Sequence, residues 1–318
     1  MTRRAAARPR ARRTSAAASW AGLLTESRNP RSARLDTLST PRVVALLLDE
    51  DRRAVSAAGR QRAAIARAAG LVADALHGGG RVVFLGAGTS GRLGVLEAAE
   101  CPPTFGTDPD RIRAVMAGGE EAVFRAVEGA EDRGEDGKAE AERLREGDIL
   151  VGVSASSVTP FVRGALETAR ARGVRTVLVT CAPRPGLRGM ADVVVAIRTG
   201  PEVLTGSTRL KAGSATKAAL NAITTAAMVR LGKAYGNLMV DLRQGSAKLR
   251  DRARRIVVAA GEVGRERAEA LLAEADGEVK TAIVMARLGL SAEEARRRIA
   301  GADGHVRAAL RGRRPRRN

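Results

Sequence analysis

The sequence predicts an α/β protein built on a doubly wound, parallel five-stranded sheet, with helices before it and a small helical bundle after it. Five short runs rich in β-branched residues support this prediction, because they are mostly apolar throughout and lie about 20–35 residues apart. Such runs are typical of strands buried on both faces of a parallel sheet. Helical stretches lie between the runs, which favours crossover helices on both faces. The runs cover residues 81–85, 112–116, 148–153, 175–179 and 192–197.

The chain before the first strand is predicted to be helical. Over residues 20–75, apolar side chains recur at helical spacing, first through Val43–Leu48 and again through Ile65, Ala68 and Leu71. The three glycines at 78–80 interrupt this pattern and mark the turn into the sheet.

Helices are also predicted after the sheet. Residues 211–232 are rich in Ala, Leu, Ile and Met, which favours one long helix. Beyond Leu249 the chain is charged and helical, with Ser291 and Glu294 in a capping-box pattern. The short helical stretches cover 266–275, 279–288 and 292–300. We therefore divide the chain into a disordered basic tail (1–20), an α/β domain with N-terminal helices (21–250), a small helical domain (251–310) and a second disordered basic tail (311–318).

The net charge of +20 is concentrated at the two ends of the chain. Residues 1–13 and 307–318 each carry six arginines and no acid, which leaves about +8 for everything between them. Tails of this kind are expected to be disordered and to contact nucleic acid or anionic lipid only weakly, in a salt-dependent way. Compositional drift is the simpler explanation, because 49 of the 55 basic residues are arginine.

Other residue counts exclude several classes of protein. No apolar run reaches the roughly 18–20 residues of a membrane span, and Met1–Arg13 does not resemble a signal peptide. Two lone cysteines, Cys101 and Cys181, are typical of reduced thiols in a cytoplasmic protein. The two histidines, His77 and His305, have no neighbours at metal-ligand spacing, so neither a zinc site nor a histidine-dependent triad is expected.

A glycine-rich loop follows the first predicted strand. Gly86, Gly88 and Gly91 form a G-x-G-x-x-G pattern, which fits a dinucleotide loop and also an ordinary tight turn. In a doubly wound sheet, ligands gather at the carboxyl ends of the strands, beside helix N-termini that favour anions. Thr89 and Ser90 add two hydroxyls to this loop, where a dinucleotide needs only backbone.

A second hydroxyl-rich turn, residues 154–160, follows the third predicted strand. Serine and threonine often only cap helices, so either turn alone is weak evidence for a ligand. Two hydroxyl-lined turns at adjacent strand ends favour one compact phosphate held from two sides.

Two pairs of carboxylates follow the loops. Glu97 and Glu100 lie three apart on the helix after the glycine loop, and they are expected to share a face, either as a catalytic pair or as a solvated surface pair. Pro102 and Pro103 are expected to end that helix, so the helix dipole would raise the pKa of Glu100, as suits a general acid. Glu131 is expected to end the next helix, from about residue 119 to 132, away from the carboxyl edge of the sheet. Judged from the surrounding residues alone, Glu131 is not a candidate for catalysis.

Many sequence blocks in one order resemble the N-acetylmuramic acid 6-phosphate etherases, which have the sugar isomerase (SIS) fold. The resemblance implies an SIS-type αβα sandwich and cleavage of the D-lactyl ether of N-acetylmuramic acid 6-phosphate, in the recycling of cell-wall sugar. It implies no metal or organic cofactor, and a cytoplasmic homodimer whose site includes residues from both subunits. The resemblance runs from about Leu23 to Leu310, and its blocks are 25–30, 35–40, 86–93, 100–104, 126–132, 202–213, 236–241 and 280–285.

The resemblance also assigns site residues. It implies that Glu100 and Glu131 are the two catalytic glutamates, although the residues around Glu131 alone do not favour it. We assign Glu100 as the proton donor and Glu131 as the base, and the reverse assignment stays open. The family's second turn usually has Gly and Arg where this chain has Ser157 and Val158, so one positive charge is missing. Phosphate and substrate binding are expected from Gly88, Thr89, Ser90, Ser154, Ser156, Ser157, Thr159, Ser207 and Lys211.

Two other functions remain open at this stage. The first is a sugar-phosphate-binding regulator on the same fold, similar to the glucokinase regulatory protein. The second is a dinucleotide-dependent oxidoreductase, which needs an acid about 20 residues after the glycine loop. Glu120 and Glu121 lie about 30 residues on, so they fit that spacing poorly.

Overall fold

A computed structural model describes residues 22–183 and 189–312 of the protein. The tail predicted over residues 1–20, and residues 313–318 of the second tail, lie outside the described residues. The division into domains at the predicted boundaries therefore stays a prediction.

The five predicted strands are all present and form one parallel sheet. The spatial order is β2-β1-β3-β4-β5, so β1 lies between β2 and β3. Gly86, the last residue of β1, pairs in register with Met116 of β2 and with Val153 of β3. This confirms the α/β class with a doubly wound sheet. The strands are β1 (Val82–Gly86), β2 (Ile112–Met116), β3 (Ile149–Val153), β4 (Arg175–Thr180) and β5 (Val193–Ala196).

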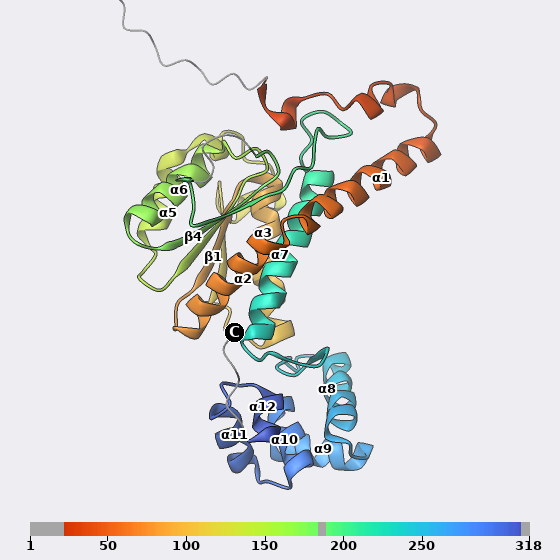
Figure 1. The fold of residues 1–318 in the computed structure, drawn as a ribbon, viewed down its shortest axis with the longest axis vertical. Coiled ribbons are helices and arrows are strands. Elements are labelled where there is room, and N and C mark those ends of the chain that lie inside the picture. Colours follow the sequence, from red (N-terminus) through yellow and green to blue (C-terminus); the bar gives the residue numbers. More distant parts are fainter. Residues whose placement is uncertain (1–21, 184–188, 313–318) are drawn as a thin grey trace, which may run out of the picture.

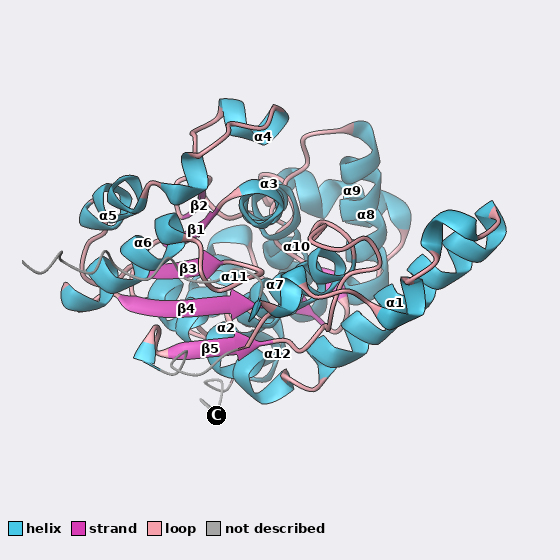
Figure 2. Cartoon of the chain, turned by 90° about the horizontal axis from the view of Figure 1, so that it is seen from above, coloured by secondary structure: helices cyan, strands magenta, loops and turns pink. Residues whose placement is uncertain are grey.

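Helices cover both faces of this sheet (Figures 1 and 2). Successive strand side chains point to opposite faces, so Val82 and Phe84 of β1 enter one core while Val83 and Leu85 enter the other. The first core is closed by α1 (Thr40–Gly59), α2 (Arg62–His77), α3 (Gly88–Phe105) and α7 (Lys211–Arg230). The second is closed by α5 (Gly134–Glu142) and α6 (Pro160–Ala171).

The N-terminal region is less helical than the sequence pattern predicts. The first α-helix begins only at Thr40, and the chain before it forms three short 3₁₀ turns, η2 (Leu24–Glu26), η3 (Pro30–Ser32) and η4 (Leu35–Thr37). Asn29 precedes a proline and is extended, at φ −80° and ψ 117°. A residue before proline is pushed away from the helical region, so the α-helix cannot extend back through this point.

Helix α3 does not end before its two prolines, contrary to the sequence prediction. It runs through Pro102 and Pro103 to Phe105, and Gly106 ends it in the left-handed conformation at φ 63°. Gly106 donates its N–H to the carbonyl of Pro102, which closes the last turn. Glu100 therefore lies more than one turn from the helix end, and the prediction that it lies at the C-terminal edge of the helix is wrong.

The helix predicted over residues 119–132 is also wrong. The segment forms only a four-residue helix, α4 (Glu121–Phe124), and a 3₁₀ turn, η5 (Ala130–Asp132). Arg125 is extended and Gly129 is left-handed at φ 69°, so the helix stops after one turn and the chain reverses. In Figure 2, α4 lies on a loop that projects beyond the β2 edge of the sheet.

The C-terminal part is helical with a core of its own. The predicted helical stretches are confirmed, and Ser291 and Glu294 form the predicted capping box. A final helix and a two-stranded hairpin, β6 (Ala234–Tyr235) with β7 (Leu238–Met239), were not predicted. The helices are α8 (Ala247–Gly261), α9 (Arg265–Glu274), α10 (Val279–Leu288), α11 (Ala292–Ala300) and α12 (Val306–Arg311), and they lie below the α/β part in Figure 1.

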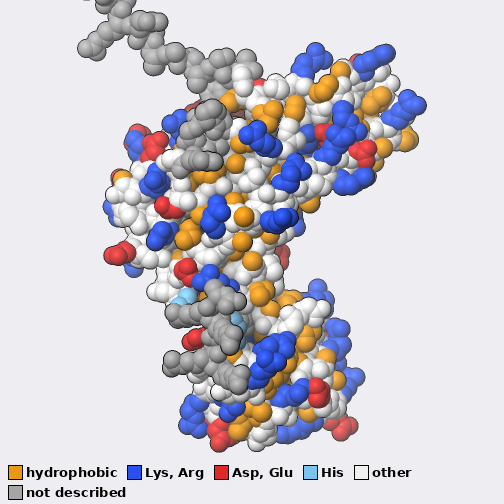
Figure 3. Space-filling model, viewed as in Figure 1, with side chains coloured by type: hydrophobic (Ala, Val, Ile, Leu, Met, Phe, Trp, Pro, Cys, Tyr) orange, Lys and Arg blue, Asp and Glu red, His pale blue; other side chains and the backbone are white. Residues whose placement is uncertain are grey.

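Charged patches, membrane-spanning helices and metal sites would each indicate a class of protein. Lys and Arg side chains are spread over both parts on the face shown in Figure 3, with acidic side chains between them. Within residues 22–183 and 189–312, no helix is both long and apolar enough to cross a membrane. Over the same ranges, no group of three or more His, Cys, Asp or Glu residues is placed to hold a metal ion.

Candidate active site

The candidate site lies at the carboxyl edge of the sheet, where β1 and β3 end side by side. The order of strands reverses at β1, because β2 lies on one side of it and β3 to β5 on the other. Ligands of open α/β sheets bind at such a switch point. Both predicted phosphate turns follow strands that end here.

The glycine loop joins β1 to α3 through close backbone contacts. A Cβ at Gly91 would lie 2.6 Å from the carbonyl oxygen of Gly86, so only glycine permits this approach. Gly88 has φ 52°, a conformation that costs glycine little. Ala87, the residue before α3, has no side chain that could cap the helix. The first backbone hydrogen bond of this turn runs from the N–H of Gly91 to the carbonyl of Ala87. The uncapped N-terminus of α3 is suited to bind an anion.

The two loop hydroxyls are available to a ligand. Thr89 and Ser90 are half-buried, and in the described part of the chain neither hydroxyl has a hydrogen-bond partner among the side-chain contacts. The methyl group of Thr89 lies beside Gly213 of α7, where an added Cβ would be 3.6 Å from it. The loop is therefore placed between the sheet edge and the first turns of α7.

The second turn is built mainly from its own hydroxyls. Ser154 Oγ and Thr159 Oγ1 are 2.9 Å apart, and Ser154 Oγ also accepts the N–H of Ser157. Ser156 Oγ accepts the N–H of Val158 over 3.4 Å. Within the described ranges, the Ser156 hydroxyl only accepts a hydrogen bond, so its proton remains available to a ligand. Within the pair of Ser154 and Thr159, one hydroxyl donates to the other, so the proton of the second also remains available.

Ser157 is the strained residue of this turn. It has φ 61°, in the left-handed region that glycine favours, and it is 1% exposed. Its hydroxyl is directed to the carbonyl oxygens of Ser156 and Ala182, at 2.6 and 3.0 Å. The Ser157 hydroxyl is thus engaged inside the protein rather than presented to a phosphate.

Lys211, a predicted binding residue, is held by a buried carboxylate. Its Nζ lies 2.5 Å from Glu50 Oε2, and both side chains are almost fully buried. Burial acts to raise the pKa of Glu50, but hydrogen bonds from Lys211 and Arg31 outweigh it and hold that pKa below its ordinary value. The ammonium group of Lys211 is therefore paired within the protein, and its role in binding stays a prediction.

A second buried carboxylate, that of Glu202, caps the N-terminus of α7. It accepts the backbone N–H groups of Lys211 and Ala212 at 3.2 and 2.9 Å. Burial raises the pKa of Glu202, although these backbone bonds lower it. The start of α7 is therefore occupied by a protein carboxylate, unlike the start of α3.

The N-terminal segment is also part of this edge, and reasoning from the sequence missed it. Asn29 donates to Glu50 at 3.0 Å and to the carbonyl of Pro201 at 3.1 Å. The N–H of Gly206, next to Ser207, donates to the carbonyl of Thr25. The block at residues 25–30 was a signal for this, since it lies outside the sheet and still formed part of the resemblance.

Glu131 lies at the glycine loop, contrary to the position predicted from its residues alone. It lines a cavity of about 180 Å³ together with Gly88, Arg92 and Glu128. Because the expected helix is broken at Arg125 and Gly129, the chain returns to the sheet edge instead of running down its face. The structure brings Glu131 and the glycine loop into one site.

Glu97 and Glu100 do not form the expected pair on one face. Glu97 is 3% exposed and accepts hydrogen bonds from Asn221 and from Thr224, the latter over 2.7 Å. Burial raises its pKa. Glu100 is exposed, and it lies about 18 Å along α3 from Gly88 at about 1.5 Å per residue. A single chain therefore does not bring Glu100 to the glycine loop.

Comparison with known proteins decides the family. The chain is 49% identical to the N-acetylmuramic acid 6-phosphate etherase of Mycolicibacterium smegmatis over 290 residues, which cover 91% of this chain and 97% of that protein. It is 52% identical to the etherase of Rubrobacter xylanophilus over 296 residues, covering 92% and 98%. The chain belongs to the N-acetylmuramic acid 6-phosphate etherase family.

Two family models and one solved structure match parts of the chain. Residues 127–226 match the SIS domain, and residues 64–170 match the Glucokinase regulatory protein N-terminal SIS domain. Among solved structures, a protein of E. coli CFT073 in complex with A5P is similar with a TM-score of 0.46 and 16% identity, over 63% of this chain and 97% of that one. A non-catalytic regulator is not favoured, because the matches along nearly the whole chain are etherases.

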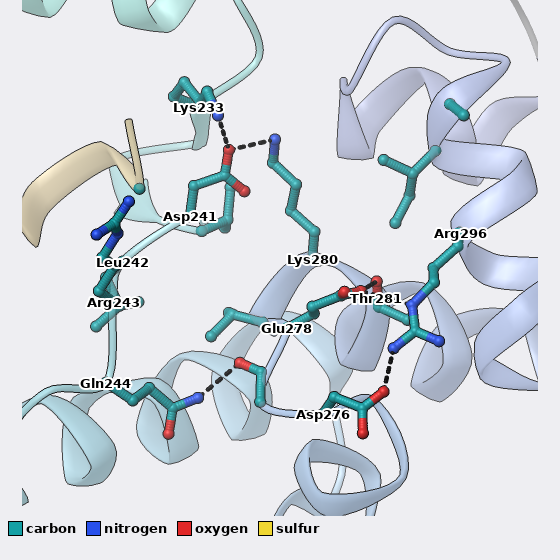
Figure 4. Close-up of a pocket in the computed structure, with 16 residues that line it drawn as sticks. Lys233, Asp241, Leu242, Arg243, Gln244, Asp276, Glu278, Lys280, Thr281 and Arg296 are labelled. Carbon is teal, nitrogen blue, oxygen red and sulfur yellow. Dashed lines mark hydrogen bonds and ion pairs between the residues drawn. The ribbon is translucent and has the colours of Figure 1, made fainter. Parts of the chain in front are cut away.

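A larger cavity of this etherase-family chain, of about 690 Å³, lies away from the glycine loop (Figure 4). The Asp241 carboxylate lies between two ammonium groups there, 2.8 Å from Lys233 and 2.7 Å from Lys280. Burial lowers the pKa of Lys280, while Asp241 acts to raise it. These ion pairs join the chain after α7 to helix α10, so they connect the helical part to the α/β part.

Proposed function

We propose that this protein is a lyase that cleaves the D-lactyl ether of N-acetylmuramic acid 6-phosphate. The products are N-acetylglucosamine 6-phosphate and D-lactate, and the reaction belongs to the recycling of cell-wall amino sugar. The observation that carries this proposal is identity near 50% to proteins named for this activity, over more than nine-tenths of the chain.

The phosphate of the substrate binds at the N-terminus of α3. The free backbone N–H groups of Gly88 and Thr89 and the hydroxyls of Thr89 and Ser90 face this position, and the helix dipole favours the negative charge there. The turn at residues 154–159 adds hydroxyls from the neighbouring strand. No arginine stands at position 158, so binding depends more on hydroxyl and backbone donors than the family pattern does.

The chemistry needs one ionised and one protonated carboxyl. In the open-chain sugar, the C1 aldehyde acidifies the proton on C2, and Glu131 removes that proton. The C3–O bond then breaks, a C2–C3 double bond forms, and the departing lactyl oxygen takes a proton from Glu100. Water adds its hydroxyl to C3 and a proton returns to C2, which gives N-acetylglucosamine 6-phosphate.

The active enzyme is a homodimer in this proposal, and each site draws on both subunits. Glu131 lines a cavity with Gly88 of its own chain. Glu100 is exposed and lies about 18 Å along α3 from that loop. A second copy supplies Glu100 to the site if the two α3 helices lie antiparallel near the two-fold axis of a dimer.

The protein acts in the cytoplasm in this proposal. Cys101 and Cys181 are both free and buried, and they are far apart in the sequence. Free thiols of this kind are typical of a reducing compartment, where the products of cell-wall recycling are consumed.

The direct test is release of D-lactate from N-acetylmuramic acid 6-phosphate by the purified protein. We expect turnover by the wild type, and loss of at least about 100-fold in kcat for Glu100→Gln and for Glu131→Gln. Glu128→Gln is the matched control, because Glu128 lines the same cavity and has no assigned role. Tight binding of the sugar phosphate without turnover would instead support a regulator.

A further inference from the structure

The segment between β2 and η5 leads to Glu131, and most of its residues are exposed. It leaves the sheet at Ala117, forms α4 and returns at Ala130, which is buried. Gly118 and Gly119 begin it with φ values of 85° and 75°, and Gly129 ends it with φ 69°. Phe124 at its tip is 88% exposed, so the segment does not gain its position from a hydrophobic core of its own.

The side chain of Arg92, in α3, is hydrogen-bonded to the backbone of this segment. Arg92 donates from Nε to the carbonyl of Val123 and from Nη2 to the carbonyl of Ala122, each over 2.8 Å. Nη2 also approaches the carbonyl of Arg125 at 3.5 Å. Arg92 lines the cavity that holds Glu131, and it is the one cationic side chain among the described residues of that lining.

The contacts of Arg92 replace what a longer helix would provide. A helix of four residues leaves its carbonyl groups without partners in a following turn. A cation at the C-terminal end of a helix satisfies these groups and is favoured by the helix dipole. The planar guanidinium can donate to two carbonyls at once, which a lysine ammonium on a flexible stem does less well.

Arg92 lies in the second turn of α3, directly after the glycine loop expected to bind phosphate. It lies two residues after Ser90, on the helix whose free N–H groups face the expected phosphate. Its guanidinium group donates hydrogen bonds to the backbone of the segment that leads to Glu131. Through this one side chain, the phosphate anchor and the expected base are connected.

We propose that Arg92 is a positioning residue that fixes Glu131 relative to the phosphate loop. This inference rests on the proposed function, since it assumes that Glu131 removes the proton from C2. Arg92 acts through the backbone of residues 122–125 and takes no part in proton transfer. Its loss leaves the phosphate site in place but lets the Glu131 segment move.

The test compares Arg92→Ala and Arg92→Lys with the matched control Arg125→Ala. Arg125 is an exposed arginine of the same segment, and among the described residues its side chain makes no ion pair or hydrogen bond. We expect Arg92→Ala to lower kcat for lactate release by about 100-fold, as a displacement of about 1 Å at a catalytic group can do. KM should change much less, Arg92→Lys should be intermediate, and Arg125→Ala should resemble the wild type.

Two further readouts separate positioning from a general loss of structure. Millimolar guanidinium should restore part of kcat in Arg92→Ala, because it can occupy the vacated position between the carbonyls. Hydrogen exchange should become faster over residues 118–131 in Arg92→Ala and stay unchanged in the strands. Unchanged kcat, a loss through KM alone, or unchanged exchange would overturn the proposal. If the wild type releases no lactate, the proposed function fails, and the exchange measurement still decides whether Arg92 holds the segment.

Discussion

Ser157 donates its hydroxyl to the carbonyl oxygen of Ala182 over 3.0 Å while its backbone stays in the left-handed region at φ 61°. The contact joins the turn after β3 to the turn after β4. The hydroxyl of Ser157 therefore holds two neighbouring turns together.

We predict that Ser157→Gly changes the free energy of unfolding by no more than about 1 kcal/mol. Glycine relieves strain of about 1 kcal/mol at this φ, but it loses one hydrogen bond of similar size and makes the unfolded chain more flexible. Ser157→Val should be destabilising by about 3 kcal/mol, because a β-branched side chain is strained at this φ and no room surrounds it. Urea denaturation measures both, and equal stability of the two variants would contradict this account.

Gly91 is predicted to tolerate no side chain, because of its contact with the strand. A Cβ there would lie 2.6 Å from the backbone oxygen of Gly86 and 3.0 Å from Met116. We expect Gly91→Ala to lower the free energy of unfolding by about 3 kcal/mol. The matched control is Gly59→Ala in α1, where nothing lies within 4 Å and a gain of about 0.5–1 kcal/mol is expected. Thermal and urea unfolding of the two variants would then shift in opposite directions.

The buried Glu97 should make stability depend on pH. Burial raises the pKa of Glu97 above the ordinary glutamate value of 4.5. The folded state therefore holds the proton more tightly than the unfolded state, and this contribution to stability is lost as pH rises through the raised pKa. Glu97→Gln removes that loss, so the variant should be more stable relative to the wild type at pH 8 than at pH 5. A difference in unfolding midpoint that is the same at both values would count against this assignment.

Asp241 should be important for holding the helical part to the α/β part. Asp241→Asn leaves the ammonium groups of Lys233 and Lys280 without their shared carboxylate. We expect a loss of about 3 kcal/mol in the free energy of unfolding, as is usual when one partner of a largely buried pair is removed. Glu269→Gln breaks the exposed pair with Arg254 and should have little effect. Similar losses in the two variants would argue against a special role for Asp241.

The strands could be predicted from the sequence because their signal is local. Val82–Gly86 and its four counterparts are mostly apolar and rich in β-branched residues, and this pattern depends on no distant contact. The end of α3 could not be predicted in the same way. The helix continues through its two prolines to Phe105, and contacts from later in the chain close its end: Gly106 is left-handed, and Arg243 donates its N–H to the carbonyl of Pro103.

The position of Glu131 could not be predicted because it depends on a side chain from another element. The stretch over residues 119–132 has helical composition, but Arg92 holds its carbonyls from α3 and Gly129 reverses the chain. The glycine loop, in contrast, could be predicted from the sequence to join a strand to a helix N-terminus, and its role as an anion site stays a prediction. The engagement of the Ser157 hydroxyl with Ala182 had no signal in the sequence, because these residues meet only through the pairing of β3 with β4.

The proposal that each active site draws Glu131 from one subunit and Glu100 from the other is tested most directly by mixing two inactive variants. Glu100→Gln and Glu131→Gln subunits are combined, allowed to exchange, and assayed for D-lactate release from N-acetylmuramic acid 6-phosphate, with two affinity tags to show that hybrid dimers form. A hybrid has one site with both glutamates intact, so the mixture should recover about a quarter of wild-type activity. An active wild type with no recovery, in a mixture shown to contain hybrids, would contradict a site shared between subunits.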